Sequence, residues 1–408
     1  VCVITGGPGT GKTTIIKTII QIYKLQKMKV VLSAPTGRAA KRMQETTGEE
    51  AKTIHRLLEI GKIEEDRKIV EYDVAPIDAD IIIVDEMSMV DVYIMNYLIK
   101  AIYLGSKLIL VGDENQLPSV GAGKVLKDII ASEKIPFISL DKIFRQAAQS
   151  QIVLNAHRVN KGEKFIEKEE KALDTKEDFF YIKENSPEKI MYQVVTLSKD
   201  RLKKYGDYDF FKNIQVLTPT KKGMLGTREL NKQLQSCLNP AVEEKSEKQY
   251  GEVIYREGDR VMQIKNNYDI YWEKRSGERH ESGVGVFNGE IGSVQKIDEE
   301  AKQIKILFDD EKIVWYGYGD LDQIEHAYCI TIHKAQGSEF DVVILAVPRA
   351  YQMLLTRNLL YTGLTRAKKL LVVIGGTDTI EFMINNTDTK QRNTGLEFKL
   401  RNSLLSKF

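Results

Sequence analysis

The stretch VCVITGGPGTGKTTIIKTIIQIYKLQ, residues 1–26, decides the fold. It begins with an apolar run typical of a buried strand and ends in residues 11–26, which place Ile and Leu side chains on one face of a predicted helix. The loop between them, residues 6–13, matches G-x-x-x-x-G-K-[ST] in full, in the strand-loop-helix context of a phosphate-binding loop. Its N–H groups would close on phosphates, Lys12 would reach the β and γ oxygens, and Thr13 would ligate Mg²⁺. We therefore predict a nucleotide site at the start of this chain.

The alternation of strand and helix continues through the first 150 residues. KVVLSAP (29–35), ADIIIVDE (79–86) and SKLILVGD (106–113) are near-continuous apolar runs. Such runs are typical of parallel strands that are buried on both faces of a sheet. RAAKRMQETTG (38–48) predicts a helix that ends at its glycine, and residues about 59–76 indicate a short polar insertion. An α/β domain is the expected result.

The same pattern returns in the second half of the chain, in NIQVLTPTKKG (213–223), DVVILAVP (341–348) and KLLVVIGG (369–376). Between the first two, residues about 243–320 are rich in glycine and in short period-two segments, which predicts a small antiparallel barrel. We therefore predict an α/β protein with two α/β domains and a β-barrel inserted in the second. The predicted limits are 1–148 for the first domain, 149–242 with 323–408 for the second, and 243–322 for the barrel.

Composition excludes several classes of protein. The chain is 42% hydrophobic and 29% charged, as an ordinary globular protein is. Its 60 Lys and Arg against 58 Asp and Glu give a net charge of +2, which neither requires nor excludes a polyanionic partner. The three cysteines lack a CxxC pair and predict reduced thiols. No signal peptide or membrane span is visible, so we expect a cytoplasmic protein of bacterial type. Because no initiator Met is present, we expect a piece of a longer protein.

Carboxylates follow the strand IIIV, where Asp85 and Glu86 stand at its end. Asp85 would hold Mg²⁺, and Glu86 would orient and deprotonate an attacking water, which argues for hydrolysis. The alternative is an acidic cap on the following helix. At the end of the next strand, GDENQ places Asp113 and Gln116 on the same sheet edge, where Gln116 could sense a γ-phosphate.

Arg145 in KIFRQ and Arg366 in YTGLTRA are the candidate arginine fingers. Each arginine taken alone is typical of a surface or packing position. Beside the site above, each could reach the γ-phosphate, which would place the nucleotide in a cleft between two domains. Hydrolysis would then move the domains.

The ordered set GGPGTGKT, APTGRAA, TIHRLL, VDE, GDENQLP, FRQ, TIHKAQGSEFD and YTGLTRA resembles the superfamily 1 DNA helicases, and among them the RecD-like group that moves 5′ to 3′. The resemblance spans nearly the whole chain and is closest to the stand-alone RecD-like helicases, without their N-terminal domain. It implies two RecA-like P-loop domains and a barrel similar to the Src-homology type 3 (SH3) fold. It also implies ATP and Mg²⁺ as cofactors, and single-stranded and tailed duplex DNA as partners. Protein partners stay open, and a monomer is compatible with the sequence.

The resemblance assigns roles around the nucleotide. Lys12, Glu86, Gln116, Arg145 and Arg366 would be catalytic, and Thr13 and Asp85 would hold the metal. Phe144 could stack on adenine, and Gly337 and Glu339 would approach ATP from the second domain, with Glu339 near the ribose. The phosphate-binding set would be Gly6, Gly7, Pro8, Gly9, Thr10, Gly11, Lys12, Thr13 and Thr14.

The predicted DNA contacts lie where parallel strands end, which is where such sheets bind ligands. Hydroxyls, backbone amides and imidazoles suit contacts to phosphate and sugar without base reading. The alternative for each histidine is a capping or core role. The recurrence of TIHR and TIHK, one in each α/β domain, favours two similar domains that each offer a Thr-x-His to one strand. The predicted residues are Pro35, Thr36, Arg38, Thr53, His55, Thr218, Thr220, Thr331 and His333.

The predicted function is an ATP-dependent 5′ to 3′ DNA translocase and helicase, acting in DNA repair or recombination. One alternative is a nucleotide-switched DNA-binding subunit of a larger nuclease complex, without unwinding of its own. A clamp that only switches conformation is another, although it would need no second arginine or TIHKAQG segment. The chain shows no acidic cluster outside the ATP site that would build a two-metal nuclease centre.

Overall fold

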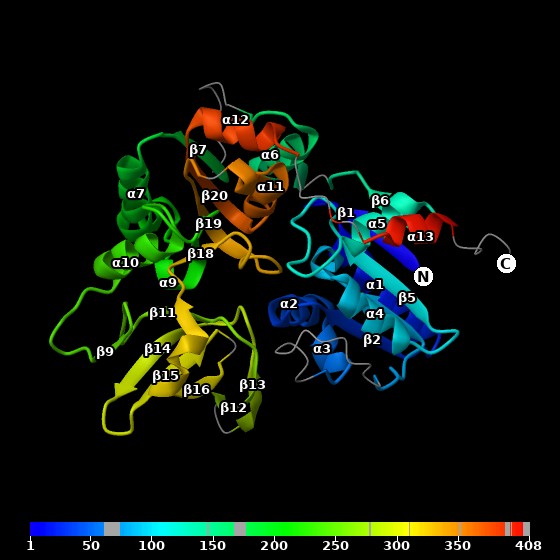
Figure 1. The fold of residues 1–408 in the computed structure, drawn as a ribbon, viewed down its shortest axis with the longest axis horizontal. Helices are drawn as coiled ribbons and strands as arrows, with labels where there is room; N and C mark the ends of the chain where they lie inside the picture. Colours follow the sequence, from blue (N-terminus) through cyan, green and yellow to red (C-terminus); the bar gives the residue numbers. More distant parts are fainter. Residues whose placement is uncertain are drawn as a thin grey trace.

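The computed structural model describes residues 1–60, 74–144, 147–166, 177–276, 279–309, 311–350, 352–387, 392 and 394–402. The predicted insertion at 59–76 therefore lies mostly outside the described residues. The described chain forms a first lobe around a six-stranded sheet, a second lobe around a five-stranded sheet, and a seven-stranded insert sheet (Figure 1).

The first lobe contains a parallel sheet covered on both faces. Ile81 and Ile83 pack with α1 and α2, whereas Ile82 and Val84 face the α3, α4 and α5 side, because successive strand residues point to opposite faces. All four side chains are fully buried, as the apolar run predicted. The strand order is β3 (Ala51–Thr53), β2 (Val30–Ala34), β4 (Ile81–Val84), β5 (Lys107–Gly112), β1 (Cys2–Gly6) and β6 (Phe137–Leu140). The helices are α1 (Lys12–Leu25), α2 (Gly37–Thr47), α3 (Ile54–Leu57), α4 (Val92–Lys100) and α5 (Val125–Ser132).

The second lobe repeats this plan. Its parallel strands run in the order β18 (Cys329–Thr331), β8 (Ile214–Thr218), β19 (Phe340–Val347), β20 (Ala367–Gly375) and β7 (Phe179–Lys183). One face packs against α6 (Gln151–Lys161), α11 (Arg357–Leu364) and α12 (Thr377–Asn385). The other face packs against α7 (Pro187–Thr196), α8 (Leu202–Gly206), α9 (Phe210–Asn213) and α10 (Thr227–Leu238).

The insert sheet is antiparallel and has its own apolar core. The buried Asp259 joins it to α10, because its carboxylate accepts hydrogen bonds from Gln235, Asn239, His326 and Tyr328. Burial opposes ionisation of this group, but the bonds from His326 and its neighbours hold the pKa of Asp259 below its usual value. The strand order is β13 (Arg279–Val286), β12 (Asn267–Ser276), β16 (Ile313–Gly317), β15 (Gln303–Phe308), β14 (Ile291–Asp298), β11 (Arg260–Gln263) and β17 (Ile324–His326). The predicted fold class, two RecA-like α/β domains with an antiparallel insertion in the second, is confirmed.

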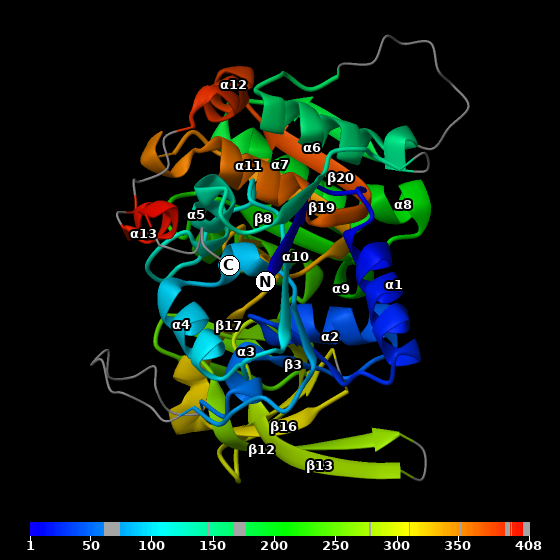
Figure 2. The same ribbon diagram turned by 90° about the vertical axis from the view of Figure 1, so that its right-hand side faces the viewer.

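The last described helix, α13 (Leu396–Asn402), returns to the first lobe and packs on α5 (Figures 1 and 2). Leu396 and Leu400 join the apolar core beneath α4 and α5. Nη1 of Arg392 donates to the carbonyls of Ser119, Gly121 and Gly123. We predicted residues 323–408 in the second domain, and the contacts of this C-terminal segment differ from that placement.

None of the helices in the described part of the chain has the length and apolar character that a bilayer span requires.

Candidate nucleotide and nucleic-acid site

The glycine-rich loop joins β1 to α1 as predicted. Gly9 and Gly11 have φ values of 72° and 84°, a left-handed conformation that glycine adopts without steric cost. The Thr10 hydroxyl donates to the Gly7 carbonyl at 2.9 Å. Lys12 Nζ donates to the carbonyls of Gly6 and Gly7 at 2.5 and 2.8 Å, which holds the ammonium at the centre of the loop. Thr13 and Thr14 follow in the first turn of α1.

The carboxylates lie beside this loop, because β4 and β5 end at the same sheet edge as β1. Burial and the neighbouring charge of Glu86 raise the pKa of Asp85 to about 6. A nearby divalent cation would favour the ionised form of this carboxyl group. A hydroxyl together with a carboxylate is a donor set that Mg²⁺ uses while it keeps several waters. The residues therefore fit the metal. Glu86 has φ 56° and ψ 40°, a conformation uncommon for a residue other than glycine and often found at functional sites.

Arg366 of the second lobe reaches the predicted sensor of the first. Its Nη2 donates to Gln116 Oε1 at 3.1 Å, and its other nitrogens donate to the carbonyls of Ser338 and Thr362 at 3.0 and 3.1 Å. Only 2% of Arg366 is exposed. Within the described part of the chain no carboxylate pairs with it, so its guanidinium is a buried cation held by neutral oxygens. A buried charge without a counter-charge is costly, which makes this position suited to an incoming anion.

Further hydrogen bonds join the lobes at this point. Tyr361 donates its hydroxyl to Asp113 Oδ2 at 2.7 Å, and burial with the charge of Asp113 raises the pKa of that phenol well above its usual value. The N–H of Leu117 donates to the Thr362 hydroxyl at 2.9 Å, and Gln336 Nε2 donates to the Leu117 carbonyl at 2.9 Å. The loop after β5 is therefore fixed by α11 and by the turn after β18.

The remaining residues predicted around the nucleotide have contacts of other kinds or lie outside the described residues. Arg145 lies outside the described residues. The Phe144 ring lies over the glycine-rich loop, where a Cβ on Gly11 would overlap it. Glu339 Oε1 lies 2.7 Å from Arg42 Nη2 of the first lobe, and its other oxygen lies 3.9 Å from Lys368 Nζ. Gly337, with φ 71°, contacts the first lobe so closely that a Cβ would lie 2.8 Å from the Thr36 hydroxyl.

Sequence reasoning missed His157, Tyr361 and Arg42. His157 Nε2 of α6 lies 3.1 Å from the Pro8 carbonyl, and with Tyr361 it leaves no room for a side chain at Gly7. The sequence around His157 carries no motif that would have singled it out. Arg42 lies in α2, one turn after Arg38 of the APTGRAA motif. The sequence alone could not show that it pairs with Glu339.

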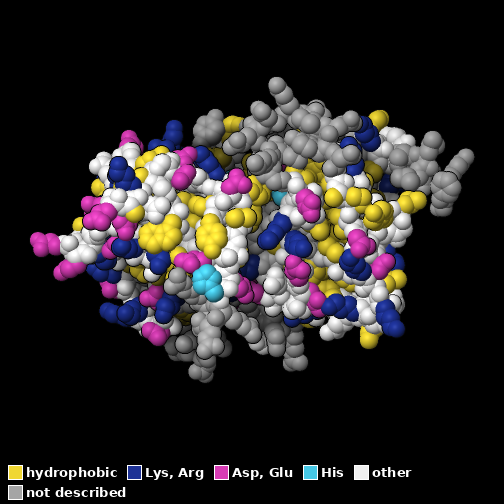
Figure 3. Space-filling view, turned by 90° about the horizontal axis from the view of Figure 1, so that it is seen from below, with side chains coloured by type: hydrophobic (Ala, Val, Ile, Leu, Met, Phe, Trp, Pro, Cys, Tyr) yellow, Lys and Arg dark blue, Asp and Glu magenta, His cyan; other side chains and the backbone are white. Residues whose placement is uncertain are grey.

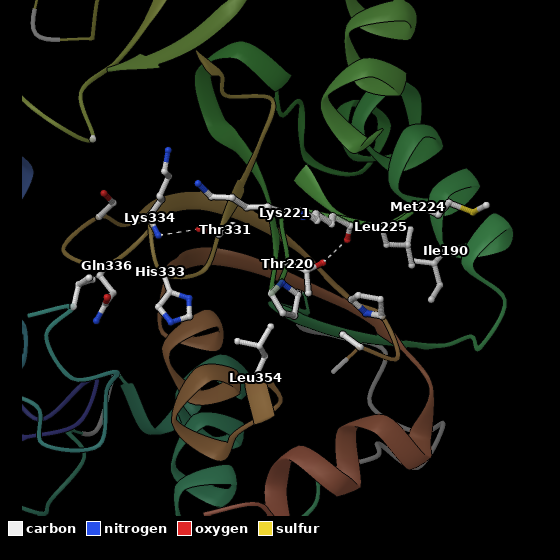
Figure 4. A pocket seen from close by; sticks show the side chains of 18 of the residues that line it. Ile190, Thr220, Lys221, Met224, Leu225, Thr331, His333, Lys334, Gln336 and Leu354 are labelled. Carbon is white, nitrogen blue, oxygen red and sulfur yellow. Dashed lines mark hydrogen bonds between the residues drawn. The ribbon is translucent and has the colours of Figure 1, made fainter. Parts of the chain in front are cut away.

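A cleft of about 1070 Å³ opens where the two lobes and the insert sheet meet (Figure 4). Its wall includes Thr36 and Arg38 of the first lobe, Thr220, Thr331 and His333 of the second, and Asn288 and Gly289 of the insert sheet. Figure 4 shows Thr220, His333 and Leu354 around the same space. Lys221, Lys222 and Arg349 add positive charge to the wall, which also includes Lys334, whose ammonium pairs with Glu325. Five of the nine predicted DNA contacts therefore line one cleft, and Pro35, Thr53, His55 and Thr218 do not.

The two Thr-x-His segments occupy equivalent places. Thr53 pairs with Ala34 at the end of edge strand β3, and Thr331 pairs with Thr218 at the end of edge strand β18. Each threonine hydroxyl accepts a hydrogen bond from the N–H three residues later, at 3.1 and 3.3 Å. The threonines therefore cap the turns that present the histidines. Desolvation lowers the pKa of His333, so this imidazole is neutral at neutral pH.

Thr218 stabilises the fold and does not line the cleft. Its side chain is fully buried, and its hydroxyl donates to the Leu225 carbonyl at 2.7 Å. This bond fixes the loop that carries Thr220 to the cleft. We correct the prediction for Thr218 accordingly, since a hydroxyl without exposed surface cannot contact a strand in this conformation. Arg38 donates to the Ser338 hydroxyl at 2.9 Å, and although burial lowers its pKa to about 10, it stays a cation at neutral pH.

The face of the molecule seen from below carries charges of both signs. Seen from below, Lys and Arg side chains lie among Asp and Glu over the visible face, without a broad basic area (Figure 3). This distribution matches the balanced net charge of +2. The basic residues of the cleft wall are therefore the candidate contacts for a polyanion.

Three segments of the chain match known families. Residues 1–122 match the AAA domain, residues 230–308 match the SH3 domain of ATP-dependent RecD-like DNA helicases, and residues 326–374 match the UvrD-like helicase C-terminal domain. The ATP-dependent RecD2 DNA helicase of Deinococcus radiodurans is 33% identical over 399 residues, which cover 98% of this chain and 50% of that protein. The RecBCD enzyme subunit RecD of Buchnera aphidicola subsp. Schizaphis graminum is 30% identical over 433 residues, which cover 90% of this chain and 69% of that subunit.

This chain thus spans about half the length of the Deinococcus relative. Among solved structures, the Bacteroides Pif1 bound to single-stranded DNA aligns with a TM-score of 0.52, at 18% identity, over 94% of this chain and 90% of that one. At that identity the likeness describes the fold.

Proposed function

This chain belongs to the RecD-like helicase family, and from that premise we propose that it is an ATP-driven translocase that moves 5′ to 3′ along single-stranded DNA and unwinds duplexes. Repair or recombination of DNA is the proposed setting. The observation that carries the proposal is the position of residues 331–339. Thr331 and His333 line the cleft, whereas Glu339 pairs with Arg42 of the first lobe, which also lies beside Glu86.

The residues of the junction suit hydrolysis of a nucleoside triphosphate. Thr13 and Asp85 would hold Mg²⁺, which would neutralise charge on the phosphates. Lys12 would exchange the carbonyls of Gly6 and Gly7 for phosphate oxygens. Glu86 would orient and deprotonate the attacking water, and Arg366 would donate to the γ-phosphate from the second lobe.

The same residues suit coupling of hydrolysis to movement. Gln116 joins Arg366 directly, so a change at the γ-phosphate position alters a bond between the lobes. Arg38, at the cleft, donates to Ser338, the neighbour of Glu339. Rotation of one lobe would therefore change the spacing of Thr36 and Arg38 relative to Thr331 and His333. Two sets of contacts that alternately hold a strand would move it through the cleft.

The test is ATP turnover with and without a single-stranded oligonucleotide, in the presence of Mg²⁺. A translocase should show a several-fold rise in kcat with DNA. ATP turnover that does not change when DNA is added would contradict the proposal. A nucleotide-switched subunit of a larger complex would bind DNA and respond to it but would not separate strands.

His333→Ala should reduce DNA stimulation about 3- to 10-fold, because it removes about one hydrogen bond, worth ~1 kcal/mol, between the cleft and the strand. Basal turnover should change much less, since His333 faces the cleft and not the glycine-rich loop. Steady-state turnover at increasing oligonucleotide concentration measures both. His280→Ala, at an exposed histidine on β13, is the matched control. Equal losses of basal and stimulated turnover would refute this division of roles.

A further inference from the structure

Arg42 lies between carboxylates of the two lobes. It belongs to α2 of the first lobe, and its Nη1 lies 3.5 Å from Glu86 Oε1. Its Nη2 lies 2.7 Å from Glu339 Oε1 of the second lobe. One guanidinium therefore contacts both the proposed catalytic base and a residue that moves with the other domain.

The contact of Arg42 with the second lobe follows from its position on α2. Arg38 and Arg42 are one turn apart, so they lie on the same face of α2. Arg38 donates to Ser338, and Arg42 pairs with the next residue, Glu339. Two adjacent residues of the second lobe are thus held by two arginines of the first, which sets the register of the lobes at this point.

The guanidinium of arginine is suited to bridging two carboxylates. A guanidinium presents its N–H groups in a fixed planar fork, so a displacement at one nitrogen rotates the other. The side chains of Arg42, Glu86 and Glu339 are 34%, 12% and 23% exposed, so water screens these contacts only in part. Burial lowers the pKa of Arg42, but the charges of Glu339 and Glu86 more than offset this effect and raise it overall.

We infer that Arg42 is a positioning residue that transmits the position of the second lobe, through Glu339, to the carboxylate of Glu86. The inference rests on the proposed function, because it gives Glu86 the role of base. With Arg42 at Oε1, the carboxylate has a defined orientation in which it can approach a water. When the second lobe rotates, Glu339 carries the guanidinium with it, and the base loses that orientation. Hydrolysis would then be fast only in one arrangement of the lobes.

This role differs from the one that the sequence suggested for Glu339. A residue that contacts the ribose would affect the KM for ATP. A residue that orients the base through Arg42 would affect kcat, and its effect would depend on Arg42 being present. The two roles therefore give different kinetics.

The experiment is a double-mutant cycle of Arg42→Gln and Glu339→Gln, with kcat and KM for ATP measured at saturating single-stranded oligonucleotide. Arg42→Gln should lower kcat about 10- to 100-fold, the range that misplacement of a catalytic group costs, with little change in KM. Glu339→Gln should also lower kcat, and the double variant should be no slower than Arg42→Gln. Arg42→Lys should recover little, because one ammonium cannot span both carboxylates.

Lys41→Gln is the matched control, because it removes a charge from the neighbouring position of α2, where Lys41 pairs only loosely with Glu45 at 3.9 Å. It should keep wild-type kcat. Circular dichroism and thermal melting check folding, and Arg42→Lys replaces Arg42→Gln if the latter unfolds.

Unchanged kcat in the Arg42 variants, or a Glu339→Gln effect confined to KM and independent of Arg42, would overturn the inference. Wild-type protein assayed in parallel distinguishes failure of the inference from failure of the proposed function. DNA-stimulated turnover by wild type with unaffected variants refutes the role of Arg42 alone. Absence of turnover by wild type refutes the proposed function and the inference with it.

Discussion

Arg366→Ala should lower ATP turnover by roughly 10³- to 10⁵-fold, the range that an arginine finger supplies in related chemistry. Among the described residues, the hydrogen-bond partners of Arg366 are neutral oxygens, so the developing negative charge on a γ-phosphate would give this buried cation an ion-pair partner. The measurement is kcat with saturating ATP, Mg²⁺ and single-stranded DNA. Binding of a fluorescent ATP analogue should persist, because the glycine-rich loop is intact.

Arg366→Lys is the informative companion variant. It keeps the charge but loses the fork that bonds Gln116, Ser338 and Thr362 together, so turnover should stay far below wild type. Thermal melting of both variants reports the structural cost of removing the buried hydrogen bonds. A lysine variant with wild-type turnover would show that charge alone suffices and that the junction contact with Gln116 is incidental.

Lys12→Ala should lower turnover about 10²- to 10³-fold, the loss expected when one preorganised donor to the reacting group is removed. Among the described residues Lys12 bonds to the carbonyls of its own loop, so the substitution should leave the fold and DNA binding in the absence of nucleotide nearly unchanged. Turnover assays and fluorescence anisotropy with a labelled oligonucleotide measure the two properties.

The matched control for Lys12 is Lys17→Ala, at an exposed lysine five positions further along α1. It should match wild type in both assays. Residual turnover in Lys12→Ala near the wild-type rate would place the hydrolytic site elsewhere and would contradict the assignment of the glycine-rich loop.

Much of the first lobe could be predicted, because its sequence patterns have local causes. The buried run at residues 81–84 predicts a central parallel strand, and parallel strands that end at one edge bring Lys12, Asp85 and Gln116 together. The distinction between Thr218 and Thr220 was not available from the sequence. Both follow the same buried strand, and only the loop conformation shows which hydroxyl is turned inward.

The parts that could not be predicted depend on how lobes and segments pack. Residues 150–210 gave little signal, because β7 is a half-buried edge strand and its flanking helices carry no motif. The pairing of Arg42 with Glu339 depends on the relative position of the lobes. The return of α13 to α5 depends on a contact between distant segments, and the sequence of a short helix does not specify its partner.

The most direct test of the central claim compares duplexes with a single-stranded tail at the 5′ end or at the 3′ end. Unwinding is followed with ATP and Mg²⁺ by separation of a labelled strand, with Lys12→Ala as the inactive control. A 5′ to 3′ translocase driven by the site between the lobes should separate the 5′-tailed duplex, and Lys12→Ala should separate neither. Preference for the 3′-tailed duplex would contradict the direction of movement, and ATP-independent separation would contradict the coupling of hydrolysis to unwinding.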